Sequence, residues 1–112
     1  MIDIRFKKRN HKLVSFKVRG HAEYYEGDQV IYDDLVCGVV SNLAQVAILG
    51  VTEVLKLKAP YIAEEGNIQL DISQLSSEEI EKCSVLLETM LLGLKNLEIS
   101  YGEYIKVSVE EV

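Results

Sequence analysis

Apolar and polar side chains alternate strictly in the first two segments of the chain. In residues 2–7 every even-numbered position is apolar, and residues 14–19 repeat the pattern. Because successive side chains of a strand point to opposite faces of a sheet, this alternation predicts two strands with one buried and one solvated face. The polar residues 8–12 predict a turn between them. Any fold of this chain must therefore cover one face of a sheet.

A long apolar segment offers one cover for that sheet. Residues 35–57 place their polar side chains on a narrow stripe of a helical wheel, which predicts a largely buried helix. Asp33 and Asp34 precede this segment and are predicted to cap its first turn, so Gly20–Asp34 is interpreted as a long loop. Polar residues interrupt the apolar segment, which favours a core helix over a membrane span.

Three further elements complete the predicted fold. Residues 60–72 predict a hairpin, and Ser76 with Glu79 forms a capping-box pattern at the start of a second amphipathic helix. The alternation returns at residues 105–109 and predicts a last strand. The expected element order is ββαββαβ. We therefore predict a single domain over residues 1–112, of α/β class and α+β type, in which a mainly antiparallel sheet packs in two layers against two helices.

Composition limits the partners that this chain is expected to have. It has 112 residues and a net charge of −6, without a lysine- and arginine-rich stripe, which argues against nucleic-acid binding and permits a basic polypeptide partner. Both cysteines lie in apolar segments, and no leader sequence or membrane segment is predicted, so we expect a cytoplasmic protein with reduced thiols. The cysteine and histidine spacing matches no metal motif, and we predict neither a metal site nor a cofactor.

Cys37 and His21 are the residues with the greatest potential for catalysis. A thiol at a helix N-terminus beside an imidazole is readily converted to the nucleophilic thiolate. Cys37 is predicted near the first turn of the first helix, and His21 lies on the irregular segment that leads to it. Asp33 or Asp34 would oppose thiolate formation unless one of them paired with the imidazolium. On local evidence alone, an inert core cysteine and a surface histidine remain the favoured interpretations.

Several neighbours of Cys37 have two interpretations each. Backbone N–H groups at Cys37 and Gly38 are oriented, at a helix start, to stabilise an oxyanion, and Gly38 would let a substrate approach closely. Ser41 lies one turn beyond Cys37 and would hold a water or substrate, or else belong to a solvated helix edge. Tyr24 and Tyr25 would line a substrate groove or simply pack over the loop.

The segments Gly20-His21-Ala22 and Asp34-Leu35-Val36-Cys37-Gly38-Val39-Val40-Ser41 closely resemble the bacterial ribosomal-processing cysteine proteases of the Prp family. The resemblance extends over essentially the full chain. It implies a cysteine endopeptidase with His21 and Cys37 as catalytic dyad, and Asp34 and Ser41 in supporting positions. It also implies a homodimer that removes a short N-terminal extension from ribosomal protein L-twenty-seven by cleaving after an aromatic residue.

Two departures from the family pattern keep other functions in view. The stretch between His21 and Asp34 is longer than usual, and Gly38 replaces a frequent alanine. A non-catalytic, ribosome-associated binding module of the same fold is therefore the main alternative. A redox-sensing thiol protein is a weaker alternative, because it requires a resolving thiol and Cys83 is predicted to lie in the core.

Overall fold

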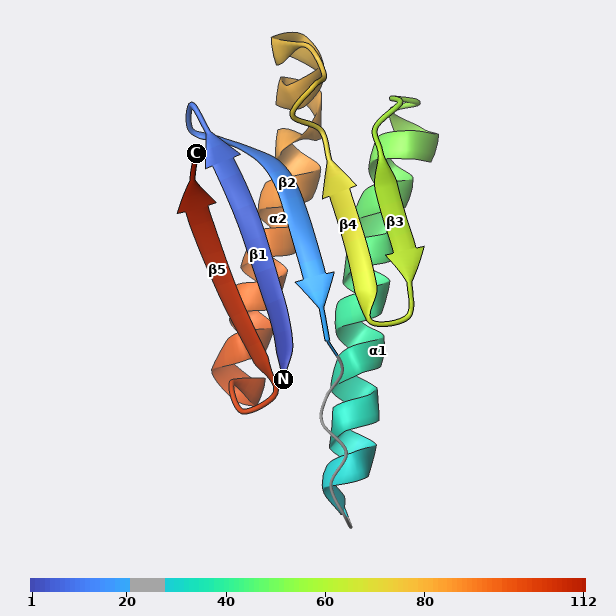
Figure 1. The fold of residues 1–112 in the computed structure, drawn as a ribbon, viewed down its shortest axis with the longest axis vertical. Helices are drawn as coiled ribbons and strands as arrows, with labels where there is room; N and C mark the ends of the chain where they lie inside the picture. Colours follow the sequence, from blue (N-terminus) through green and yellow to red (C-terminus); the bar gives the residue numbers. More distant parts are fainter. Residues whose placement is uncertain (21–27) are drawn as a thin grey trace.

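Five strands and two long helices form the protein (Figure 1). The structure, a computed structural model, describes residues 1–20 and 28–112, with side chains from residue 35 onward in the second range. The elements are β1 (Ile2–Arg9), β2 (Lys12–Arg19), α1 (Asp28–Leu49), the π-helical segment η1 (Gly50–Val54), β3 (Tyr61–Glu64), β4 (Asn67–Asp71), α2 (Ser77–Tyr101) and β5 (Ile105–Glu111). The predicted order ββαββαβ is confirmed. The segment η1 falls within the predicted helix over residues 35–57, but its π-helical geometry was not predicted.

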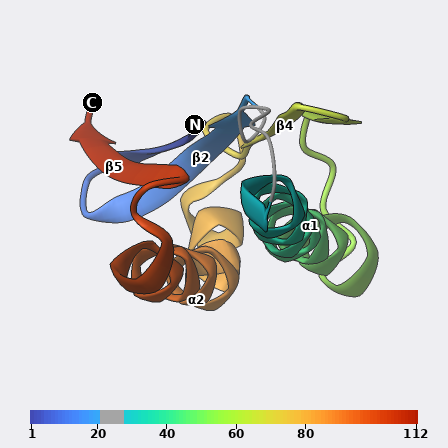
Figure 2. The same cartoon turned by 90° about the horizontal axis from the view of Figure 1, so that it is seen from below.

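The strands form one mixed sheet in the order β3-β4-β2-β1-β5. Only β5 runs parallel to its neighbour β1, and the other three pairings are antiparallel, as predicted. Both helices lie on the same side of this sheet, and its other side is open (Figure 2). The two-layer α+β architecture is therefore confirmed. At one end of the molecule, β2 ends close to α1 and to the β3–β4 turn (Figure 1).

The predicted apolar faces of the strands form the core. Phe6 and Phe16 are Cα partners across β1 and β2, and their ring centroids lie 5.8 Å apart. Such aromatic cross-strand pairs stabilise a sheet beyond the area they bury. The helices supply the opposite wall of the core with Val36, Val40, Ala44, Ala47, Ile48, Ile80, Cys83, Leu87, Met90, Leu91 and Leu94.

The second helix starts as its sequence predicts. Ser76 Oγ accepts a hydrogen bond from the Glu79 backbone N–H at 3.1 Å, and Glu79 Oε1 accepts one from the Ser76 N–H at 3.0 Å. This capping box satisfies two backbone donors that a helix start leaves without intrahelical partners. One turn further, Cys83 is fully buried, which confirms it as a core residue. Burial, with a smaller contribution from Glu79, raises the pKa of the Cys83 thiol.

The first helix is less buried than predicted. Leu35, Val46 and Leu49 are 55%, 54% and 53% exposed, because only one side of α1 contacts the sheet and α2. By length and composition alone, Leu35–Val54 is apolar enough to cross a membrane. The inner side of that segment nevertheless packs on the sheet through residues such as Val40 and Ala44. An apolar outer surface therefore remains uncovered within one chain.

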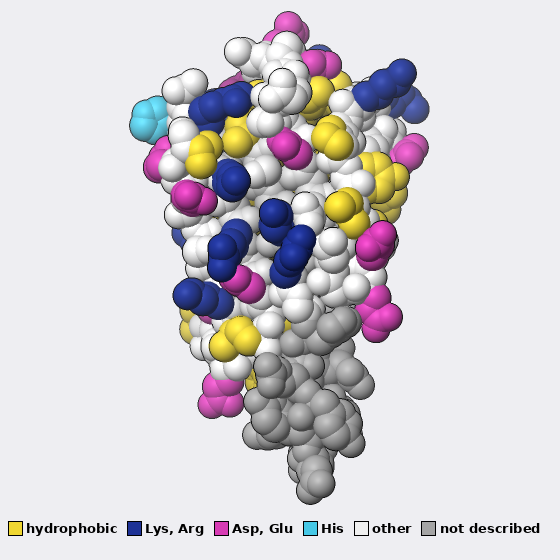
Figure 3. All heavy atoms as spheres, in the orientation of Figure 1, with side chains coloured by type: hydrophobic (Ala, Val, Ile, Leu, Met, Phe, Trp, Pro, Cys, Tyr) yellow, Lys and Arg dark blue, Asp and Glu magenta, His cyan; other side chains and the backbone are white. Residues whose placement is uncertain are grey.

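The open face of the sheet carries a cluster of cations (Figure 3). Arg5 and Lys17 are direct Cα partners across β1 and β2, and Asp3 is the partner of Arg19. Asp3 also accepts a hydrogen bond from the Arg5 Nε at 2.9 Å and forms an ion pair with its Nη2 at 2.9 Å. Like charges placed directly opposite each other reduce sheet stability. Sequence composition did not predict this cluster, because a net charge averages over both faces of the molecule.

Candidate active site

Cys37 lines a pocket of about 270 Å³ at the end of the sheet where β2 stops. Three parts of the chain form its walls: the α1 segment from Cys37 to Ser41, the start of β1 with the end of β2, and the β3–β4 turn. The described lining residues are Ile2, Val18, Gly20, Cys37, Gly38, Val40, Ser41, Glu65, Gly66, Asn67 and Ile68. Its aliphatic lining side chains are buried, and its polar ones, Ser41, Glu65 and Asn67, are partly or fully exposed, so the pocket has an apolar floor and a polar rim. Such a pocket suits a peptide whose side chain fills the floor while its backbone lies along the rim.

A hydrogen bond between backbone groups fixes two of these walls. The Gly20 N–H donates to the carbonyl oxygen of Gly66 at 3.1 Å, which ties the end of β2 to the β3–β4 turn. Gly20 has a φ of +101° and Gly66 a φ of +75°, both in the region that favours glycine. A Cβ on Gly20 would lie 2.6 Å from the carbonyl oxygen of Met1. Glycine is therefore required where the chain leaves the sheet beside the pocket.

The position of Cys37 within its helix differs from the prediction. Helix α1 begins at Asp28, so Asp33 and Asp34 lie inside it and do not precede it as caps. Cys37 is then in the third turn, where backbone N–H groups already bond to the carbonyl four residues earlier. The helix start near Cys37, on which the predicted oxyanion role of the backbone N–H groups at Cys37 and Gly38 was based, is therefore not present in this geometry. The predicted loop over Gly20–Asp34 is also too long, because its residues from Asp28 onward belong to α1.

The other predicted site residues fall into two groups. Gly38 and Ser41 line the same pocket as Cys37. His21, Tyr24 and Tyr25 lie outside the described residues, as does the side chain of Asp34, whose backbone belongs to α1. Neither Cys37 nor Cys83 is disulfide-bonded. Among the described residues, no group of three or more His, Cys, Asp or Glu side chains could hold a metal ion.

The β3–β4 turn is the part of the site that the sequence did not predict. Glu65, Gly66 and Asn67 lie far from Cys37 in the chain, and reach the pocket because β4 pairs with β2. Asn67 is oriented by Gln69, whose Nε2 donates to Asn67 Oδ1 at 2.7 Å. The sequence predicted this turn as part of a hairpin, but not its position at the site. Only the strand order, which is a long-range property, places it beside the thiol.

The family comparison decides what kind of site this is. The model of the family described as cysteine protease Prp matches residues 1–106. The chain belongs to the Prp family of cysteine proteases. It is therefore an enzyme that cleaves peptide bonds through a cysteine, and the pocket at Cys37 is its candidate active site. Among curated proteins, no match was found.

Solved structures share the fold of this protease along its whole length. SMU.848 from Streptococcus mutans is 25% identical, with a TM-score of 0.81, covering 100% of this chain and 96% of that one. The essential ribosomal processing protease Prp from S. aureus, in complex with a substrate peptide, is 18% identical, with a TM-score of 0.79, covering 98% and 100%. The same S. aureus protease with a covalently linked product peptide is 20% identical, with a TM-score of 0.65 and the same coverages.

Gly38 is not required by the packing of the site, and this leads to a prediction. Among the described residues, a Cβ at Gly38 would meet no atom within 4 Å, and the same holds for Gly93 in α2. Alanine in a helix interior is favoured over glycine by about 0.8–1 kcal/mol. We expect Gly38→Ala and Gly93→Ala each to raise the free energy of unfolding by about that amount in urea titrations.

The two variants differ in what they do to the pocket. The added methyl group of Gly38→Ala lies on the pocket wall beside Cys37, whereas Gly93 lies away from it. Only Gly38→Ala is therefore expected to change KM for a peptide substrate. A destabilised Gly38→Ala protein, with Gly93→Ala stabilised as expected, would show that the backbone at Gly38 needs glycine for a reason other than space.

Proposed function

We propose that this protease removes a short N-terminal extension from the precursor of ribosomal protein L-twenty-seven, with Cys37 as nucleophile and His21 as base. The observation that carries the proposal is the position of Cys37 on a peptide-sized pocket in a chain whose family is that of the cysteine protease Prp. Further support comes from a solved relative of the same fold, the S. aureus ribosomal processing protease, which was crystallised with a substrate peptide.

We propose that His21 pairs with Cys37 because Gly20, the residue before His21, is held at the pocket. Gly20 directly precedes His21 in the chain and lines the same pocket as Cys37. The bond from the Gly20 N–H to Gly66 holds that neighbour in place. With Cys37 in the third turn of α1, the helix end contributes little to forming the thiolate. An imidazole base is therefore the main requirement for activation of the thiol.

The reaction that we propose has two chemical steps. His21 accepts the proton of the Cys37 thiol, and Sγ attacks the carbonyl carbon of the scissile bond. The tetrahedral intermediate collapses to an acyl-enzyme as His21 returns the proton to the leaving amine. Water, deprotonated by His21, then attacks the thioester, releases the new carboxyl terminus and restores the thiol.

Side chains on the pocket wall are the candidate donors to the oxyanion. Helical backbone N–H groups near Cys37 are engaged within α1, so they are poor candidates. Ser41 lies one turn along the same wall, and its hydroxyl is a donor. Asn67 also lines the pocket, and among the described residues the hydrogen bond from Gln69 engages its Oδ1 and not its Nδ2 donor group. A donor of this kind is worth about 10²–10³-fold in kcat.

A cleavage assay tests the proposed function. Purified protein is incubated with the extended L-twenty-seven precursor, and the product is measured by mass spectrometry. We expect one cut behind an aromatic residue, leaving the mature N-terminus. Binding without any change of mass would instead support the ribosome-associated binding module. Cleavage of the precursor by a His21→Ala variant at an undiminished rate would remove His21 from the mechanism.

We further propose that the uncovered helix faces join two copies of this chain. Val85, Leu92 and Ile99 are 75%, 66% and 84% exposed on the outer side of α2, and their spacing of seven residues places them on one stripe. Leu35 and Val46 add exposed apolar side chains on α1, which lies beside α2 (Figure 2). A self-complementary apolar face of this kind suits a twofold interface.

Sedimentation of two matched variants tests this dimer. Leu92→Glu places a charge in the middle of the proposed interface, and we expect the mass in solution to fall from a dimer to a monomer. Ile62→Glu is the control, because Ile62 pairs with Gln69 and points away from the helices on the open face of the sheet. A Leu92→Glu protein that forms dimers over the same range of protein concentration as the wild type would exclude this interface.

The ligand and location complete the proposal. We propose a peptide and no nucleic acid for the pocket, because Glu65 is the one charged side chain among its described lining residues, and a carboxylate repels phosphate.

We also propose a cytoplasmic enzyme, since the catalytic thiol must stay reduced. Cell fractionation with an antibody against the native chain tests the location, and a membrane-bound pool would contradict it.

A further inference from the structure

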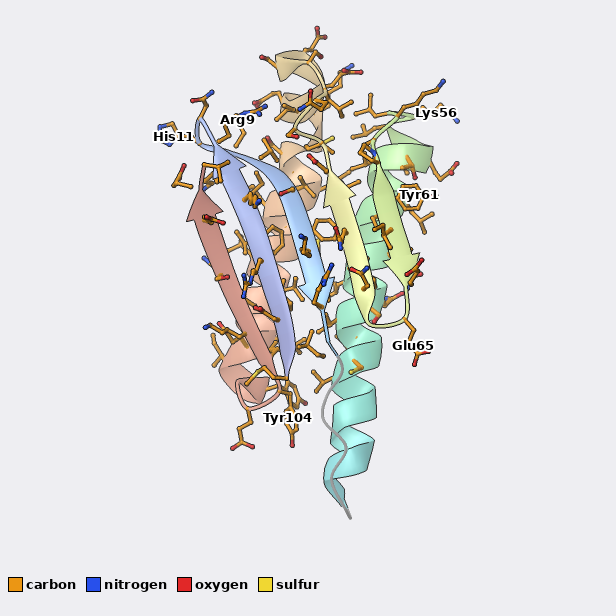
Figure 4. All side chains as sticks on the ribbon, viewed as in Figure 1. Arg9, His11, Lys56, Tyr61, Glu65 and Tyr104 are labelled. Carbon is orange, nitrogen blue, oxygen red and sulfur yellow. The ribbon has the colours of Figure 1, made fainter. Side chains whose placement is uncertain are left out.

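The rim of the active-site pocket carries a single carboxylate that the catalytic mechanism does not use. Glu65 lies at the tip of the β3–β4 turn, from which its side chain extends outward (Figure 4). It lines the pocket together with Cys37 and Ser41. All other described lining residues are uncharged. Glu65 is exposed, and among the described residues it forms no ion pair. The rim of the pocket therefore carries one carboxylate that a basic side chain of a bound peptide could reach.

The turn that presents Glu65 is held in a defined place. Gly66 adopts a φ of +75° and its carbonyl oxygen accepts the hydrogen bond from Gly20 at 3.1 Å. On either side of the turn, Glu64, the last residue of β3, pairs with Asn67, the first residue of β4. The backbone of Glu65 is thus fixed relative to the end of β2 and to the pocket. Its neighbour Glu64 does not line the pocket, although it carries the same charge.

We infer that Glu65 forms a subsite for a lysine or arginine side chain of the substrate, close to the scissile bond. This inference rests on the proposed peptidase function and adds a charge preference to it. A pocket of about 270 Å³ has a width comparable to two residues of an extended chain, at about 3.3 Å each. The basic side chain therefore lies within about two residues of the cleaved bond. Its ammonium or guanidinium group pairs with the Glu65 carboxylate at the pocket rim.

Matched peptides test this subsite. Each peptide carries one lysine at a position within that range, and its partner carries methionine, an uncharged side chain of similar length. We expect the wild-type enzyme to prefer lysine at one position by about two- to fivefold in kcat/KM, the range of an exposed ion pair. This ratio should fall to about one in Glu65→Gln and below one in Glu65→Lys. Glu64→Gln is the control and should keep the wild-type ratio.

A binding measurement separates this inference from the proposed chemistry. The dissociation constants of the same labelled peptides are measured by fluorescence anisotropy on a Cys37→Ala background, with and without Glu65→Gln. If no peptide is cleaved, the peptidase proposal fails, and the lysine-to-methionine ratio of these constants still decides the role of Glu65. The preference should shrink as ionic strength rises. Equal binding of both peptides at every position, or an unchanged ratio in Glu65→Gln, would overturn the subsite.

Discussion

Replacing Cys37 with alanine is expected to lower kcat/KM for precursor cleavage by about 10³-fold or more. Without a sulfur atom the acyl-enzyme cannot form, and only the binding and oxyanion contributions of the pocket remain. Because Cys37 is partly buried on the pocket wall, the smaller alanine should leave the fold and peptide binding intact. Product mass measured over time for both proteins gives the rates, and thermal unfolding confirms that the variant is folded.

Cys83 provides the matched control for Cys37. Burial raises the pKa of the Cys83 thiol, so this thiol stays protonated at neutral pH and is shielded from reagents. We expect Cys83→Ala to lose about 1 kcal/mol of stability through the small cavity it creates, and to keep the wild-type kcat/KM. Iodoacetamide should modify Cys37 well before Cys83 in the native protein. Cleavage by Cys37→Ala at the wild-type rate would contradict the assignment of the nucleophile.

The sheet and the second helix were predictable because their signals are local. Strict alternation in residues 2–7 decides which side chains are buried, since a shift of one residue would expose all of them. The capping box of Ser76 and Glu79 places the start of α2 correctly, because both hydrogen bonds join residues that are close in the chain. Elements defined by such short-range chemistry need no knowledge of the tertiary structure.

The start of the first helix was not predictable by the same means. Asp33 and Asp34 resemble N-terminal caps, but acidic residues are also favourable within the first turns of a helix, where the helix dipole attracts them. Asp28, the first residue of α1, offers the same kind of signal. Composition cannot choose between these starts. The error moved Cys37 from the helix end to the third turn and changed which groups can stabilise the oxyanion.

The third wall of the active site depends on information that a single segment does not contain. Glu65 and Asn67 join the pocket because β4 pairs with β2, in the register that places Asn67 opposite Arg19. Hydrophobic alternation identifies strands without giving their order in the sheet. For the same reason, net charge did not predict the cations that gather at Arg5 and Lys17 on the open face. Both features appear only when strands distant in the chain become neighbours.

The largest loss of stability is expected from Gly20→Ala. Its φ of +101° is strained for any residue with a Cβ, and that atom would lie 2.6 Å from the Met1 carbonyl oxygen. We expect the free energy of unfolding to fall by about 2–4 kcal/mol, from the backbone strain and the displacement of the chain start together. Urea titration followed by circular dichroism measures this loss. Gly93→Ala, which adds the same methyl group in open space, is the control and should be stabilised.

The same substitution should also disturb catalysis in the molecules that remain folded. To relieve the contact with Met1, the end of β2 must shift, which weakens the hydrogen bond from the Gly20 N–H to Gly66. That bond joins two walls of the pocket, and the next residue in the chain is the proposed base His21. We therefore expect kcat/KM to fall in Gly20→Ala even at temperatures where the protein is fully folded. Normal stability in this variant would show that the chain start is free to move, and normal activity would show that the anchor at Gly20 does not position the site.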